Sequence, residues 1–255
     1  MQTRQLLLEE YDKVLRDNNE SFNIAVITNS KARVGGILLV GMNPSKDDGA
    51  PEYDYLEDCW GGNFWNPKHK MMGSNPDMVN VKDRIGGYDM HCGYIDLFPL
   101  RGSKLDKIIC YNTDKNRMMG QLLSVTQDYI EALRPKLIIF ANRKDCYYWG
   151  DFYKKAESVR VAQQDSWMGY QLYRQTSPLE GNQEKGRWEY YKIEGIAPSG
   201  VNRYKNETNL KGSYFLHYRQ HSAKCGVVPP SQELTSSDIE CILNSISPDL
   251  AKSLL

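Results

Sequence analysis

The stretch GGILLVGMNPSKDD, residues 35 to 48, decides the fold class of this chain. Its apolar run, residues 37 to 40, is short, rich in branched side chains and bounded by glycine and proline, which is typical of a buried strand. The run ends in Gly41-Met42-Asn43-Pro44-Ser45, and Asn-Pro commonly starts a turn. In open α/β sheets, ligands bind where such strands end. The stretch therefore predicts a buried strand at residues 36–42 whose carboxyl end carries either a chemical site or only a turn.

The rest of the chain alternates apolar and amphipathic segments. Strands are predicted at residues 92–100, 136–142, 187–198 and 213–222. Helices are predicted at residues 2–17, 116–134 and 143–159, with one or two more after residue 235. Residues 44 to 90 show little periodicity and read as a long loop, and residues 163 to 213 are mostly polar. This alternation predicts βαβ units and a mostly parallel sheet.

Composition excludes several classes of protein. Lys and Arg number 32, as do Asp and Glu, so no global positive field indicates a nucleic-acid partner, and any such contact must come from a local patch. A candidate patch is the basic and aromatic stretch 211–224, although an ordinary solvated strand face is the simpler interpretation. No apolar run approaches the roughly 20 residues that span a bilayer, and the six cysteines form no C-x-x-C pair. We expect a cytoplasmic protein with reduced thiols and no membrane contact.

The carboxyl ends of parallel strands meet at one edge of a sheet. That edge would bring together three segments: residues 42–45, 96–101 and 142–144. If the late strand runs in the same direction, His221 and Ser222 would join them. The sequence thus predicts one candidate site built from segments far apart in the chain.

These segments resemble the uracil-DNA glycosylase superfamily. Gly41-Met42-Asn43-Pro44 is identical to the first motif of the branch that acts on single-stranded and modified uracil. DLFPLR, residues 96–101, is similar to the second motif, with Asp96 where the family has Asn, and RQHS, residues 219–222, to the late one, without its proline. The resemblance implies a three-layer αβα fold with a central, mostly parallel four-stranded sheet. We expect a single domain, residues 1–255, with an insertion at about 160–210.

The resemblance also implies roles for the edge residues. Asn43 would position a water molecule and His221 would stabilise the leaving base, as the two catalytic residues. Asp96 would read the base, but it donates a hydrogen bond only when protonated. Trp60 and Phe64, in the long loop, would stack on a flipped base. The substrate-binding residues expected are Gly41, Met42, Pro44, Ser45, Asp96, Phe64, Trp60, Ser222 and His217. We expect no cofactor and no metal, because no His or Cys spacing suits a metal site.

Three functions remain open at this stage. The first is a DNA glycosylase-like hydrolase that cleaves the N-glycosidic bond of uracil or another damaged base, with damaged DNA as the partner. The second is a nucleobase- or nucleotide-binding protein of the same fold without the activity. The third is a partner-binding module in which the aromatic loop docks a protein. For His217, in mid-strand, a packed histidine is the simpler interpretation.

Overall fold

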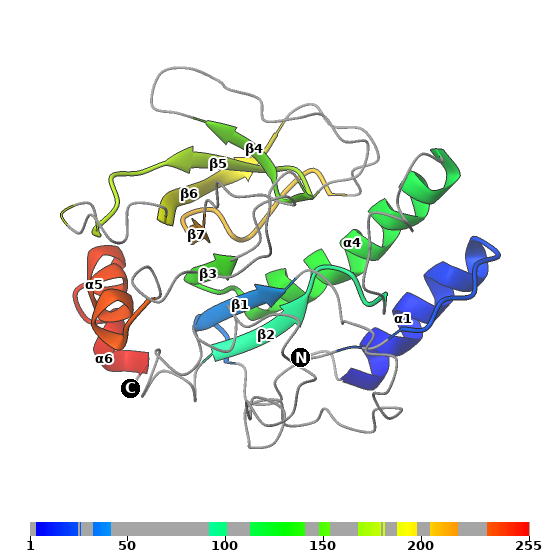
Figure 1. Cartoon of the computed structure of the whole chain (residues 1–255), viewed down its shortest axis with the longest axis horizontal. Helices are drawn as coiled ribbons and strands as arrows, with labels where there is room; N and C mark the ends of the chain where they lie inside the picture. Colours follow the sequence, from blue (N-terminus) through cyan, green and yellow to red (C-terminus); the bar gives the residue numbers. More distant parts are fainter. Residues whose placement is uncertain are drawn as a thin grey trace, which may run out of the picture.

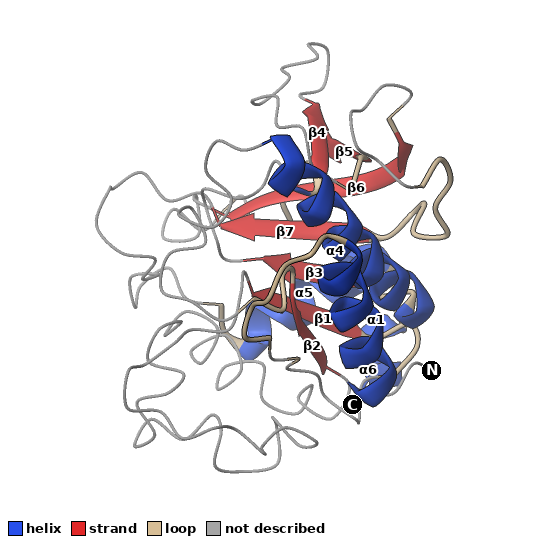
Figure 2. Ribbon diagram, turned by 90° about the vertical axis from the view of Figure 1, so that its right-hand side faces the viewer, coloured by secondary structure: helices blue, strands red, loops and turns tan. Residues whose placement is uncertain are grey.

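A mixed sheet forms the centre of the computed structural model, and within the part of the chain that it describes the sheet has seven strands in the order β2-β1-β3-β7-β6-β5-β4 (Figure 1). Figure 2 shows the strands in this order, from β4 at the top to β2 at the bottom. The structure describes residues 4–24, 26, 33–41, 92–100, 113–140, 148–153, 168–179, 181, 188–197, 205–218 and 234–254. The prediction of an α/β protein is confirmed.

Four neighbouring strands form a parallel half of the sheet: β1 (Ile37–Gly41), β2 (Cys92–Asp96), β3 (Leu137–Phe140) and β7 (Tyr214–Tyr218). β1 pairs with β2 and with β3, and β3 pairs with β7, all in parallel. β1 and β3 are buried along their whole length, which explains why their sequences are continuously apolar. All four lie within segments predicted to be strands.

The other half of the sheet corrects the expected four-stranded sheet. It consists of β4 (Gly150–Tyr153), β5 (Tyr170–Arg174) and β6 (Trp188–Ile196). β6 is antiparallel to both β7 and β5, whereas β4 is parallel to β5. The sheet is therefore larger than expected and mixed, because the chain between β3 and β7 adds three strands to the open edge of β7.

Strand β4 also corrects the helix predicted over residues 143–159. Gly150 begins this strand with a φ of 149°, in a region that favours glycine. A side chain at this position would collide with the backbone of Tyr170, its register partner in β5. The aromatic residues that follow Gly150 thus belong to a strand that needs glycine for close pairing.

Helices cover both faces of the sheet. In Figure 1, α1 (Arg4–Asp17) and α4 (Thr113–Leu133) lie on one side, and α5 (Ser236–Ile246) and α6 (Leu250–Leu254) on the other. The two apolar clusters between these layers contain Leu38 and Ile95 on the α1/α4 face and Leu39 and Tyr94 on the α5/α6 face. No helix in the described ranges is both long enough and apolar enough to cross a membrane.

Hydrogen bonds connect the backbone just after β2 to both α1 and α4. The hydroxyl of Thr126 donates to the carbonyl of Leu97 at 2.7 Å, and the Tyr11 hydroxyl lies 2.7 Å from the same Thr126 oxygen. Tyr11 is buried, so its hydroxyl needs this partner. These bonds fix the backbone immediately after Asp96 against the helical layer.

Candidate functional site

The order of the strands identifies the edge of the sheet where a ligand is expected. β2 lies on one side of β1, and the chain then crosses back through α4 to place β3 on the other side. In open α/β sheets such a reversal opens a crevice outside the carboxyl ends of the strands concerned. Here those ends are Gly41, Asp96 and Phe140. Strand order alone thus points to the edge that the sequence motifs predict.

Gly41 and Asp96 come together at this edge. They are register partners in the parallel pairing of β1 and β2, and the Leu97 N–H donates to the Gly41 carbonyl at 3.0 Å. A Cβ at residue 41 would collide with Oδ1 of Asp96 and with the hydroxyl of Tyr94. Glycine is therefore required at the end of β1 because two polar groups from β2 occupy the space of its missing side chain.

Tyr94 holds one oxygen of the Asp96 carboxyl. Its hydroxyl donates to Oδ1 of Asp96 at 2.7 Å, from two residues earlier on the same face of β2. Asp96 is 5% exposed, and its Oδ2 has no hydrogen-bond partner among the residues described. A buried oxygen without a partner is uncommon in folded proteins and needs a physical explanation.

Burial also changes the charge of this carboxyl. It raises the pKa of Asp96 to about 7, although the hydrogen bond from Tyr94 acts in the opposite direction. The neutral acid and the carboxylate are therefore both accessible near neutral pH. A neutral acid can donate a hydrogen bond, whereas a carboxylate only accepts.

His217 does not join this arrangement. It is buried beside the rings of Phe140 and Phe215, with centroids 6.0 and 6.2 Å away, and Phe152 lies 6.2 Å away on another strand. Phe140 and Phe215 belong to the cluster under α1 and α4, whereas Tyr94, and with it Asp96, faces α5 and α6. His217 and Asp96 thus lie on opposite faces of the sheet.

Of the residues predicted for the site, the structure describes Gly41, Asp96 and His217, and it brings only the first two together. The others lie outside the described residues: Met42, Asn43, Pro44, Ser45, Trp60, Phe64, His221 and Ser222. Tyr94 was not predicted, although its i, i+2 spacing from Asp96 on a strand is a signal that could have identified it. In the described ranges, no three His, Cys, Asp or Glu residues gather as a metal site would require.

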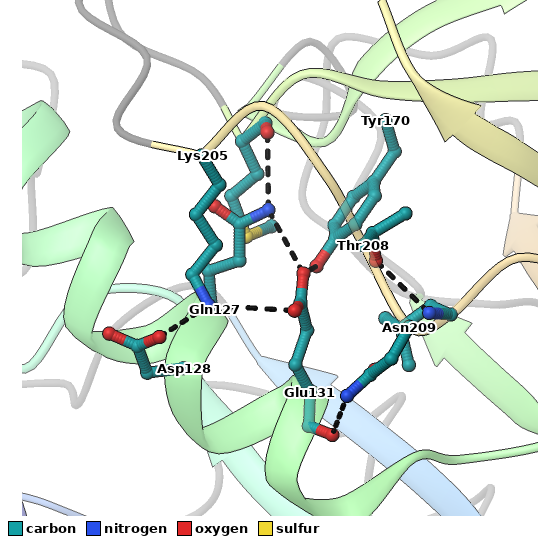
Figure 3. Close-up of polar contacts among 9 residues, drawn as sticks. Gln127, Asp128, Glu131, Tyr170, Lys205, Thr208 and Asn209 are labelled. Atoms are coloured by element: carbon teal, nitrogen blue, oxygen red, sulfur yellow. Dashed lines mark hydrogen bonds and ion pairs between the residues drawn. The ribbon is translucent and has the colours of Figure 1, made fainter.

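Figure 3 shows the contacts of a second buried polar cluster, centred on Glu131 of α4. Glu131 lies near the end of α4, shortly before Leu137 begins β3, so this cluster is at the opposite end of the strands from Asp96. Oε1 of Glu131 accepts from the Tyr170 hydroxyl at 3.2 Å and from Gln127 Nε2 at 3.5 Å, while Oε2 contacts Lys205 Nζ at 3.5 Å. Asn209 donates to the Glu131 carbonyl at 3.0 Å. Both carboxylate oxygens have partners, so this cluster holds α4, β5 and the segment before β7 together.

No family model, no curated protein and no solved structure matches the chain. The function is therefore inferred from the residues themselves and from the edge that Gly41 and Asp96 form.

Proposed function

We propose that this protein is a DNA glycosylase-like hydrolase that cleaves the N-glycosidic bond of uracil or another damaged base in DNA. The observation that carries the proposal is the buried Asp96 carboxyl, seated against Gly41 at the carboxyl edge of β1 and β2. The motif Gly41-Met42-Asn43-Pro44 continues from that point, so Asn43 follows the glycine by only two residues. A base-reading group and a water-positioning group would thus come from adjacent strands.

The chemistry assigns each residue a distinct task. The bond between C1′ of the sugar and the base breaks with its electron pair going to the base, while a water oxygen bonds to C1′ and loses a proton to solvent. The transition state carries positive charge on the sugar and negative charge on the base. The Asn43 side-chain carbonyl orients the water, His221 donates to the base oxygen where charge develops, and Asp96 binds the ring edge.

Access to the base requires flipping it out of the stack. Trp60 and Phe64 are the proposed stacking partners of the flipped ring. Aromatic stacking tolerates any base, so it supplies affinity while the polar groups supply selectivity.

The second candidate is a nucleobase- or nucleotide-binding protein that lacks hydrolysis. Two observations favour it: Asp96 stands where the enzymes that the motifs resemble carry Asn, and His217 packs against aromatic rings on the far face of the sheet. A partner-binding role for the aromatic stretch around Trp60 and Phe64 is the third candidate.

Formation of abasic sites separates these functions. The protein is incubated with single- and double-stranded oligonucleotides that carry uracil, hypoxanthine or xanthine, and alkali-labile sites are counted. We expect cleavage of at least one substrate, a fall of about 100-fold or more in Asn43→Ala, and no change in Asn244→Ala, whose side chain is exposed on α5. Absence of abasic sites with every substrate rejects hydrolysis.

A partner-binding role predicts instead that Trp60→Ala abolishes a protein contact and leaves nucleic-acid binding unchanged.

A further inference from the structure

The two buried carboxyl groups described above differ in how their oxygens are satisfied. Both oxygens of Glu131 have hydrogen-bonding partners, whereas Oδ2 of Asp96 has none among the described residues. A buried acceptor left unsatisfied destabilises the folded protein. The exception falls at the strand edge where ligands of open α/β sheets bind. A ligand atom is therefore the natural partner of this oxygen.

The position of Tyr94 decides which oxygen of the neutral acid carries the proton. Because the Tyr94 hydroxyl donates to Oδ1, that oxygen acts as an acceptor. A proton on Oδ1 would compete with the Tyr94 proton. The acid proton of Asp96 therefore belongs on Oδ2, which becomes a single O–H donor.

We propose that Asp96 binds a nucleobase as a neutral carboxylic acid, with Oδ2–H donating to the 4-carbonyl oxygen of a pyrimidine or the 6-carbonyl oxygen of a purine. It thereby selects lactam bases, such as uracil and hypoxanthine, over their amino counterparts, cytosine and adenine. This specificity role rests on the proposed nucleobase site but does not depend on hydrolysis. At the 4-position of a pyrimidine or the 6-position of a purine, an O–H donor meets a carbonyl oxygen on a lactam and an amino N–H donor on an amino base, and two facing donors repel.

The electrostatic environment supports the neutral form. Burial is the main cause that raises the pKa of Asp96 to about 7, and a ligand carbonyl that accepts from Oδ2–H would raise it further, because that hydrogen bond exists only in the neutral form. Tyr94 on β2 donates to this carboxyl, and Tyr11 on α1, on the other face of the sheet, interacts with the charge of Asp96. Burial raises the pKa of Tyr11, so Tyr11 stays neutral and brings no compensating charge. Binding above pH 7 therefore requires the uptake of one proton.

Calorimetric titration with free bases tests the proposal. Uracil is compared with cytosine, and hypoxanthine with adenine, at pH 6 and pH 8 in two buffers of different ionisation enthalpy. We expect tighter binding of uracil and hypoxanthine, a fall of about tenfold in their affinity from pH 6 to pH 8, and proton uptake at pH 8. Tighter binding of the amino bases, a flat pH dependence, or no binding of any of the four bases overturns the proposal.

Variants assign the effect to Asp96. Asp96→Asn places an N–H donor at the position of Oδ2 in a group that does not titrate, so it should keep the base preference and lose the pH dependence. Asp96→Leu should lose both. The ¹³C shift of the Asp96 carboxyl in the unaltered protein gives an answer that needs no variant: it should titrate near pH 7, and an ionised carboxyl at pH 5 contradicts the proposal. Lactam preference without abasic-site formation would reject the hydrolase and retain this inference.

Discussion

Gly41 and Asp96 face each other across β1 and β2, and the carboxyl Oδ1 of Asp96 occupies the space where a side chain at residue 41 would begin. The sheet edge is thus built around a missing side chain. The first residue of the Gly-Met-Asn-Pro motif has a packing reason to be glycine, separate from any role in a turn.

Gly41→Ala should destabilise the protein by about 1–3 kcal/mol, the range for overpacking a filled site. The new methyl group would collide with Asp96 and Tyr94. Urea unfolding measures the loss. The matched control is Gly181→Ala, because Gly181 is exposed and has open space around it. The destabilisation should shrink in the Gly41→Ala/Asp96→Ala double variant, and equal losses in the single and double variants would refute the packing account.

Asp96→Asn should change how stability depends on pH. The folded pKa of Asp96 is raised to about 7, whereas an unfolded aspartate titrates at about 3.9. The folded state therefore holds this proton over a range where the unfolded chain has released it, so stability falls as pH rises from about 4 to about 7 and stays lowered above that. The full effect is on the order of 4 kcal/mol.

The measurement is the difference in free energy of unfolding between the parent and Asp96→Asn at a series of pH values. Taking the difference cancels the other carboxyl groups. The variant should gain on the parent between pH 4 and pH 7. A constant difference over this range would show that Asp96 is ionised in the folded protein.

The Glu131 cluster should matter for stability and not for base binding. Glu131→Gln places an amide beside the donors Lys205 and Gln127, and we expect a loss of about 1–3 kcal/mol. The comparison is Arg16→Met, which breaks the exposed pair between Arg16 and Asp12 at 2.7 Å and should lower stability by less than about 1 kcal/mol. Equal losses in urea unfolding would mean that the buried cluster contributes no more than a surface pair.

His217→Leu should lower stability by about 1–3 kcal/mol and leave the preference for lactam bases intact. The ring of His217 packs against Phe140, Phe152 and Phe215 on the face away from Asp96. Calorimetry with uracil and cytosine measures the preference, and Asp96→Leu is the counterpart that should abolish it. If His217→Leu loses the preference for lactam bases, then His217 takes part in base binding and this prediction is wrong.

The parallel half of the fold could be predicted from the sequence because each of its strands is buried and carries its own local signal. Residues 37–40 and 137–140 are continuously apolar, and α1 and α4 show helical periodicity. β4 and β5 could not be predicted from the sequence, because their stability comes from pairing with distant segments. β5 is only half buried, with exposed Tyr173 and Arg174, so its sequence reads as polar.

The site was predictable to a similar degree. A strand ending at Asp96 and a strand ending at Gly41 place both residues at one edge once the strands are parallel. The separation of His217 from Asp96 was not predictable, because alternation within a strand does not say which face of the sheet its residues share with those of another strand. The packing reason for glycine at residue 41 could not be predicted either, because it depends on the register that places Asp96 opposite this residue.

Chemical-shift mapping with uracil tests the central claim most directly. Backbone amide shifts of the ¹⁵N-labelled protein are recorded at pH 6 as uracil is added. The account predicts saturable changes at Gly41, Asp96 and Leu97, with none around Glu131 and Tyr170 at the opposite end of the strands. Changes confined to the Glu131 end, or no saturable change anywhere, would contradict a nucleobase site at the carboxyl edge of β1 and β2.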